Sequence, residues 1–156
     1  MARGDHLGLS AHVSVDVREL VRLAHRATGR SGAEDGTTAR ILLGMGELLP
    51  GWFDDWVLMD RERLRQLRLH ALESACTQLI GARNFASAVE LGLAAVAVEP
   101  LRESAHMALA RAFLAEGNRS EAILDFRRFR ELLEGELGIC PSATFARLVG
   151  ERAASG

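Results

Sequence analysis

Apolar residues recur every three or four positions along most of this chain, which is the spacing of an amphipathic α-helix. Such stripes predict helices over residues 17–28 and 33–43, and a further helix of about twenty residues that begins at Asp60. Another stripe predicts a helix over residues 119–134, in which Ala122, Phe126, Phe129 and Leu133 share one face. Gly135, Gly138 and Pro141 should end it, and Ser142 or Thr144 should start a last short helix.

The first fifteen residues are different, because apolar and polar positions alternate loosely there, as in an extended chain. The pattern as a whole predicts an all-α protein of about six to seven antiparallel helices. We expect an extended segment over residues 1–15, one helical domain over residues 16–150 and a disordered tail over residues 151–156.

The second half of the chain repeats itself at an offset of 34 residues. Asn84-Phe85-Ala86-Ser87-Ala88-Val89 returns as Asn118-Arg119-Ser120-Glu121-Ala122-Ile123. The same offset pairs Leu67 with Leu101, Ala71 with Ala105, Ala75 with Leu109, and Leu79 with Phe113. A 34-residue period built from two helices is the tetratricopeptide signature, so the fold should be a tetratricopeptide-like helical repeat. One position departs from the pattern, because Gly92 stands where the second unit has the aromatic Phe126.

Composition and charge narrow the class of protein. The chain is 48% hydrophobic and 26% charged, which is normal for a globular domain of 156 residues. The net charge of −2 provides no global field toward DNA or an acidic membrane. The arginine runs at residues 61–68 and 127–130 are interleaved with acidic residues, so we interpret them as solvated, ion-paired faces and expect no direct DNA binding. No apolar run is long enough for a signal peptide or a membrane helix, which predicts a cytoplasmic protein.

The residues that carry chemistry are not arranged as a catalytic or metal site. The two cysteines, Cys76 and Cys140, lie far apart and are interpreted as reduced, structural thiols. The five histidines have no ligand spacing and are expected at the surface: His6, His12, His25, His70 and His106. No glycine-rich phosphate loop or nucleophile motif is present. We therefore predict that the chain is not an enzyme and needs neither a metal nor a cofactor.

Three groups of residues carry a family resemblance. The first is Leu48-Leu49-Pro50-Gly51-Trp52-Phe53-Asp54-Asp55-Trp56 followed by Glu62-Arg63-Leu64-Arg65. The second is Pro100-Leu101-Arg102-Glu103-Ser104-Ala105-His106 with Ala115-Glu116-Gly117-Asn118-Arg119, and the third is Leu137-Gly138-Ile139-Cys140-Pro141-Ser142. Over residues 16–148 the chain resembles the bacterial transcriptional activator domain (BTAD) of the Streptomyces antibiotic regulatory protein (SARP/AfsR) family. The resemblance implies a tetratricopeptide-like domain that follows an OmpR-type winged helix in regulators of secondary metabolism.

The resemblance also implies what this chain lacks. Residues 4–15 resemble the end of a winged-helix domain, but the DNA-reading helix itself is not in the sequence. DNA contact is therefore expected only through a winged-helix domain absent from this chain. The expected partners are proteins: a second copy, a winged-helix regulator, or the transcription machinery.

The repeat predicts which surface binds such a partner. In tetratricopeptide units the first helix of each pair lines a concave groove. By period, the groove positions are His70, Glu73, Thr77 and Ile80 in the first unit, and Ser104, Met107, Arg111 and Leu114 in the second. The alternative is that these residues contact other helices of the same domain.

Two hypotheses for function follow. The first is a regulatory module for protein–protein interaction or oligomerisation. The second is a small-metabolite sensor, in which the groove or the aromatic cluster Trp52-Phe53-Asp54-Asp55-Trp56 binds a ligand. For that cluster, the competing interpretation is an aromatic plug at the end of the helical bundle.

Overall fold

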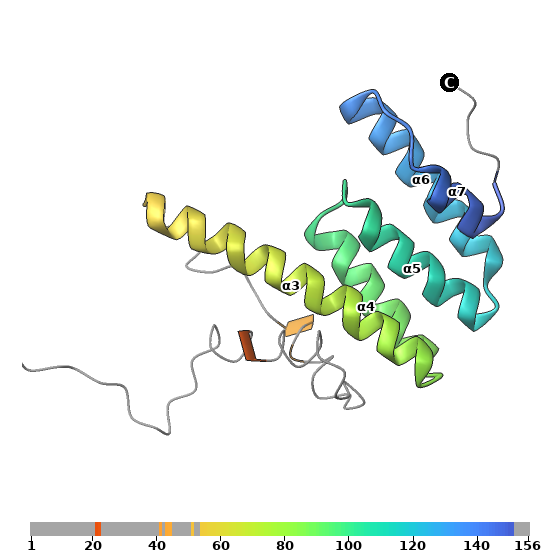
Figure 1. Cartoon of the computed structure of the whole chain (residues 1–156), viewed down its shortest axis with the longest axis horizontal. Coiled ribbons are helices and arrows are strands. Elements are labelled where there is room, and N and C mark those ends of the chain that lie inside the picture. Colours follow the sequence, from red (N-terminus) through yellow and green to blue (C-terminus); the bar gives the residue numbers. More distant parts are fainter. Residues whose placement is uncertain (1–20, 23–40, 42, 45–50, 52–53, 152–156) are drawn as a thin grey trace, which may run out of the picture.

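The structure is a computed structural model, which describes residues 21–22, 41, 43–44, 51 and 54–151. Within these residues it is all-α, with five packed antiparallel helices (Figure 1). They are α3 (Asp55–Gly81), α4 (Phe85–Val98), α5 (Glu103–Glu116), α6 (Arg119–Leu137) and α7 (Ala143–Val149). Five is fewer than the six to seven expected. The two helices predicted over residues 17–28 and 33–43 lie outside the described residues, except for a few positions that are helical, as does the extended segment over residues 1–15.

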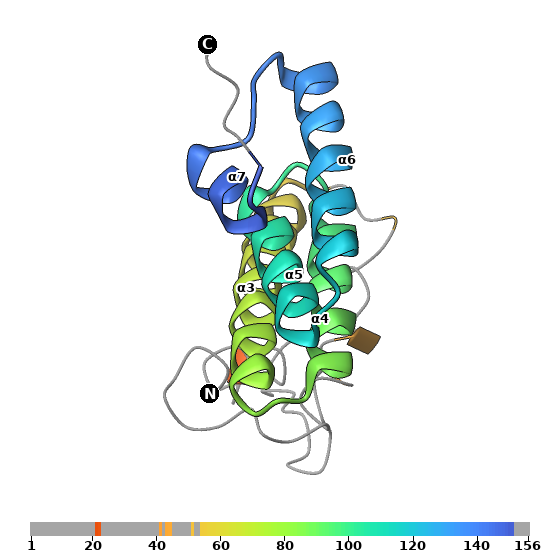
Figure 2. The same ribbon diagram turned by 90° about the vertical axis from the view of Figure 1, so that its right-hand side faces the viewer.

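The helix α5 lies at the centre of the bundle and contacts each of the other four described helices. Consecutive helices pack against each other from α3 to α7, and α5 additionally contacts α3 and α7. Figure 2 shows α4 and α6 on one side of the bundle and α3 and α7 on the other, with α5 between them. The segments that carry the predicted groove positions, α3 and α5, are therefore direct neighbours.

The start of α3 differs from the prediction. The helix begins at Asp55 rather than Asp60, so Trp56 lies within it. Asp54 has an extended backbone and its carbonyl accepts from the N–H groups of Val57 and Leu58, which starts the first turn. Asp55 in that turn places a negative charge at the positive end of the helix.

The other helix ends follow local turn chemistry. The Asn84 side chain accepts from the Ser87 N–H at the start of α4, and Ser142 accepts from the Phe145 N–H at the start of α7. The helix α6 continues past Gly135 to Leu137 and ends at Gly138, whose φ of 67° is left-handed. The predicted helix over residues 119–134 was therefore too short, because a glycine inside a helix weakens it without ending it.

The turns after α3 and α5 use the same backbone conformation with different residues. Gly117 follows α5 with a φ of 92°, and 34 residues earlier Arg83 follows α3 with a φ of 61°. Arg83 is the one described non-glycine residue with a positive φ. A left-handed conformation costs an ordinary side chain about 1 kcal/mol or more, so the turn after α3 is strained.

Two hydrophobic clusters hold the helices together. The first core joins α3, α4 and α5, and consists of Leu69, Ala71, Leu72, Ala75, Cys76, Leu79, Ala88, Leu91, Ala95, Ala105, Ala108 and Ala112. The second core joins α5, α6 and α7, and consists of Ala110, Ala122, Phe126, Phe129, Leu133, Phe145, Ala146 and Val149. All four residues of the predicted α6 stripe are buried in the second core, which confirms that stripe.

Gly92 explains the departure noted in the repeat. It is buried in α4, and a Cβ atom built on it would lie 2.9 Å from the Cα atom of Leu109 in α5. The two backbones therefore approach too closely for any side chain at this position. In the second core, the ring of Phe126 instead packs edge-on against Phe145, with centroids 4.9 Å apart.

Candidate functional site

The eight predicted groove residues lie on the two neighbouring helices α3 and α5, four on each. Four are exposed, namely His70, Thr77, Ser104 and Arg111. The other four are half-buried, namely Glu73, Ile80, Met107 and Leu114. None belongs to the fully buried residues of either core, so all eight remain available in part to a partner. The alternative interpretation also holds in part, because Ile80 packs against the first core, and Met107 and Leu114 against the second.

Two of the eight residues join the helices to each other. Glu73 on α3 accepts a hydrogen bond from the Ser104 hydroxyl on α5, at 2.7 Å. The same Glu73 oxygen accepts from Arg102 Nε at 2.7 Å, and Arg102 also donates to Gln66 at 2.9 Å. Arg102 was not among the predicted residues, because it precedes α5 and only the fold brings it to α3. This cluster of Glu73, Ser104, Arg102 and Gln66 fixes the spacing of α3 and α5.

The remaining polar residues of the face are less engaged. The Thr77 hydroxyl donates to the Glu73 carbonyl one turn earlier in its own helix, at 3.0 Å. His70 and Arg111 make no hydrogen bond or ion pair with the described part of the chain. Arg111 therefore presents an unpaired guanidinium between the half-buried side chains of Met107 and Leu114.

A buried thiol lies beneath this face. Cys76 is fully buried, and its thiol donates to the carbonyl of Ala108 at 3.6 Å. Burial raises the pKa of Cys76 to about 11, and the positive charge of Arg111 only partly opposes that rise. The thiol is therefore a packed structural group rather than a nucleophile. Cys140, in contrast, is exposed, so the expectation of two structural thiols is wrong for it.

The prediction of surface histidines is wrong for His106. Its side chain is buried, and the ring stacks on Phe129 with centroids 4.2 Å apart. One ring nitrogen, Nδ1, lies 3.0 Å from the Asp125 carboxylate on α6, and the other, Nε2, lies 3.0 Å from the Pro100 carbonyl oxygen. The repeat contained a signal for this burial, because Leu72 and Leu91 precede His106 and Asp125 by 34 residues and are both buried.

This His–Asp pair does not form an acid–base centre. A catalytic histidine that is oriented by a carboxylate needs its second nitrogen free for the substrate. Here the second nitrogen of His106 is occupied by the Pro100 carbonyl and the ring is covered by Phe129. The pair therefore links α5 to α6. Among the described residues, no three His, Cys, Asp or Glu side chains gather closely enough to hold a metal ion.

The arginine runs are only partly the solvated faces that were predicted. Arg65 forms a bidentate pair with Glu62 and also contacts Glu99, and Arg127 pairs with Glu151 at 2.7 Å. The Glu62 hydrogen bond raises the pKa of Arg65, and the Arg65 hydrogen bond lowers the pKa of Glu62. Arg68 is different: burial lowers its pKa, and its Nε has no hydrogen-bond partner.

The aromatic side chains of the cluster Trp52-Phe53-Asp54-Asp55-Trp56 lie outside what the structure describes, because Trp52 and Phe53 are not among the described residues and nothing is described of the Trp56 side chain. The metabolite-sensor hypothesis therefore stays a prediction. In the described part of the chain, no helix has the length and apolarity needed to cross a membrane.

The described helices thus form an all-helical domain in which the buried His–Asp pair joins two helices. Comparison with known families identifies the class of domain: the model of the bacterial transcriptional activator domain, a regulatory domain, matches residues 15–151, and the chain belongs to that family. The match agrees with the resemblance carried by the sequence motifs. No curated protein matched the chain in a separate search.

Proposed function

We propose that this chain is a protein–protein interaction module of a SARP/AfsR-type transcriptional regulator of secondary metabolism. A partner protein docks on the groove face of α3 and α5, defined by the eight residues named above. In this proposal the helices act as tetratricopeptide-like units, an interpretation supported by the 34-residue offset and by the side-by-side packing of α3 and α5. DNA contact is made by a winged-helix domain rather than by these helices.

The observation that carries the proposal is the exposed, unpaired Arg111 between two half-buried apolar side chains, Met107 and Leu114. Interfaces are enriched in arginine and methionine, and an arginine beside apolar anchors is a common hot spot. The polar cluster around Glu73 holds α3 and α5 at a fixed spacing, so the face is preorganised for a partner.

The test uses purified protein and two named partners, an OmpR-type winged-helix domain and bacterial RNA polymerase holoenzyme. Binding is measured by biolayer interferometry for the parent chain, Arg111→Glu and Met107→Ala. Loss of a hot-spot residue costs about 2 kcal/mol, so each variant should bind roughly thirty-fold more weakly.

Two variants outside the groove face serve as controls. Arg83→Glu, in the turn after α3, makes the same charge change as Arg111→Glu at an exposed residue, and Ile123→Ala on α6 truncates a half-buried apolar residue packed against the second core, as Met107→Ala does. Both should bind the partner as the parent does. The proposal fails if neither partner binds, or if the groove variants bind as tightly as these controls.

A further inference from the structure

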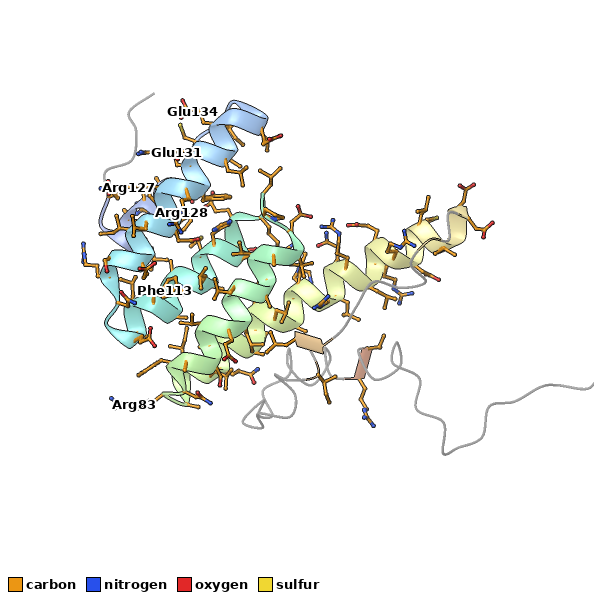
Figure 3. The ribbon with its side chains drawn as sticks, turned by 180° about the vertical axis from the view of Figure 1, so that it is seen from behind. Arg83, Phe113, Arg127, Arg128, Glu131 and Glu134 are labelled. Carbon is orange, nitrogen blue, oxygen red and sulfur yellow. The ribbon has the colours of Figure 1, made fainter. Side chains whose placement is uncertain are left out.

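The helix α6 carries a second exposed face, on the side opposite to its buried stripe. Leu124, Arg128, Glu131 and Leu132 are spaced by four, three and one positions, which places them together on one side of the helix. All four are exposed, with relative exposures of 41% for Leu124 and 37% for Leu132. Figure 3 shows Arg128 and Glu131 in a row along α6, with Arg127 and Glu134 beside them.

The two charges at the centre of this face are unpaired. Arg127 is engaged by Glu151. Arg128 and Glu131, in contrast, make no hydrogen bond or ion pair within the part of the chain that the structure describes. They are three residues apart with the arginine first, which is the weaker order for a pair inside one helix. One positive and one negative group are thus left free side by side, flanked by two exposed leucines.

This arrangement is complementary to itself. If a second α6 lies antiparallel across the first, with a two-fold axis between residues 129 and 130, Arg128 of each chain faces Glu131 of the other. One contact then makes two identical ion pairs, and Leu124 and Leu132 of each copy lie beside them. A partner with a single sign of charge would satisfy only one member of the pair and leave the other desolvated.

We propose that the α6 face of Leu124, Arg128, Glu131 and Leu132 is a self-association surface, on which a second copy of this chain docks antiparallel. The surface lies on α6, apart from the groove face of α3 and α5, so a dimer leaves that groove free for a different protein. This proposal does not depend on the proposed function of the groove. Because it uses one helix from each copy, the contact is small and the dimer weak.

Sedimentation velocity of the full chain over a concentration series tests the proposal through charge reversal. The parent should pass from monomer to dimer as its concentration rises, and added salt should weaken the dimer. Arg128→Glu places Glu against Glu twice, and Glu131→Arg places Arg against Arg twice. Each variant should therefore weaken self-association at least tenfold. The double variant Arg128→Glu/Glu131→Arg restores both pairs and should dimerise like the parent.

A mixture of the two single variants gives the sharpest outcome. In the mixed dimer the Glu introduced at position 128 of one chain faces the Arg introduced at position 131 of the other, and the two native groups face each other. Two chains that are each monomeric should therefore associate with one another. The proposal is overturned by a parent that stays monomeric at all concentrations, by single variants that dimerise like the parent, or by a mixture that does not associate. The Arg111→Glu variant, changed only in the groove, should dimerise normally whether or not the groove binds a partner.

Discussion

Gly92→Ala should destabilise the protein, although alanine is the better helix former. A Cβ atom at position 92 would lie 2.9 Å from the Cα and 3.1 Å from the Cβ of Leu109. Carbon atoms in ordinary contact are about 3.5–4.0 Å apart, so α4 and α5 must separate by roughly half an ångström or more. The Leu109 side chain cannot relieve the contact by rotating, because the nearest atom belongs to the backbone.

Two opposing contributions set the size of the effect. Overpacking a close-packed site costs about 1–3 kcal/mol. Replacing glycine with alanine inside a helix gains about 1 kcal/mol. We therefore expect Gly92→Ala to lower the free energy of unfolding by about 1 kcal/mol.

Urea denaturation followed by circular dichroism measures this change at low protein concentration. The matched control is Gly135→Ala in α6, where the added Cβ meets nothing within 4 Å. The control should raise the free energy of unfolding by up to about 1 kcal/mol, because only the helix preference changes. Equal stabilisation by both substitutions would refute the close approach of α4 and α5.

Three further predictions concern the strained turn, the buried pair and the buried thiol. Arg83→Gly should raise the free energy of unfolding by about 1 kcal/mol in thermal melts, since glycine adopts the φ of 61° without strain; a loss of stability would contradict the strain. Asp125→Leu alone should cost about 2–3 kcal/mol by leaving His106 buried without its partner, whereas Asp125→Leu with His106→Leu should recover most of that loss; additive losses in this double-mutant cycle would rule out the coupling. In the native protein near neutral pH a thiol reagent should label Cys140 alone, and Cys76 only after denaturation. The folded state holds the Cys76 proton up to a pKa of about 11, whereas an unfolded thiol loses it near about 8.5, so stability should fall as the pH rises above about 9; a flat profile would argue against this burial.

The helix positions and much of the core could be predicted because they depend on local spacing. The stripe of Ala122, Phe126, Phe129 and Leu133 is visible as steps of three and four, and it is buried as predicted. Ser142 could likewise be predicted as one of two candidate starts of α7, because an N-cap side chain bonds to the backbone only two or three residues further along the chain. The family could be predicted for a different reason, because the resemblance depends on specific short sequence motifs and not on helical spacing.

Contacts between helices could not be predicted from local spacing. His106 was placed at the surface because its partner Asp125 lies on another helix. Arg102 joins Glu73 across 29 positions, and its role depends on how closely α3 and α5 pack. Gly92 looked like a defect in the repeat, whereas it marks a close approach of the α4 and α5 backbones. The 34-residue period indicated that His106 is buried, but the distances between helices that decide these three contacts are not encoded in any period.

The position of α5 has a consequence for how the domain responds to binding. Ala105, Ala108 and Ala112 face the first core, whereas Ala110 faces the second, so α5 is the one described helix whose fully buried side chains belong to both cores. The α3–α4 pair and the α6–α7 pair therefore pack against the same helix, α5, through two separate cores. A partner that shifts α5 from the groove side would move both cores together. Because α5 itself carries half of the groove face and also packs against α6, it is the helix through which a groove partner can displace the α6 face.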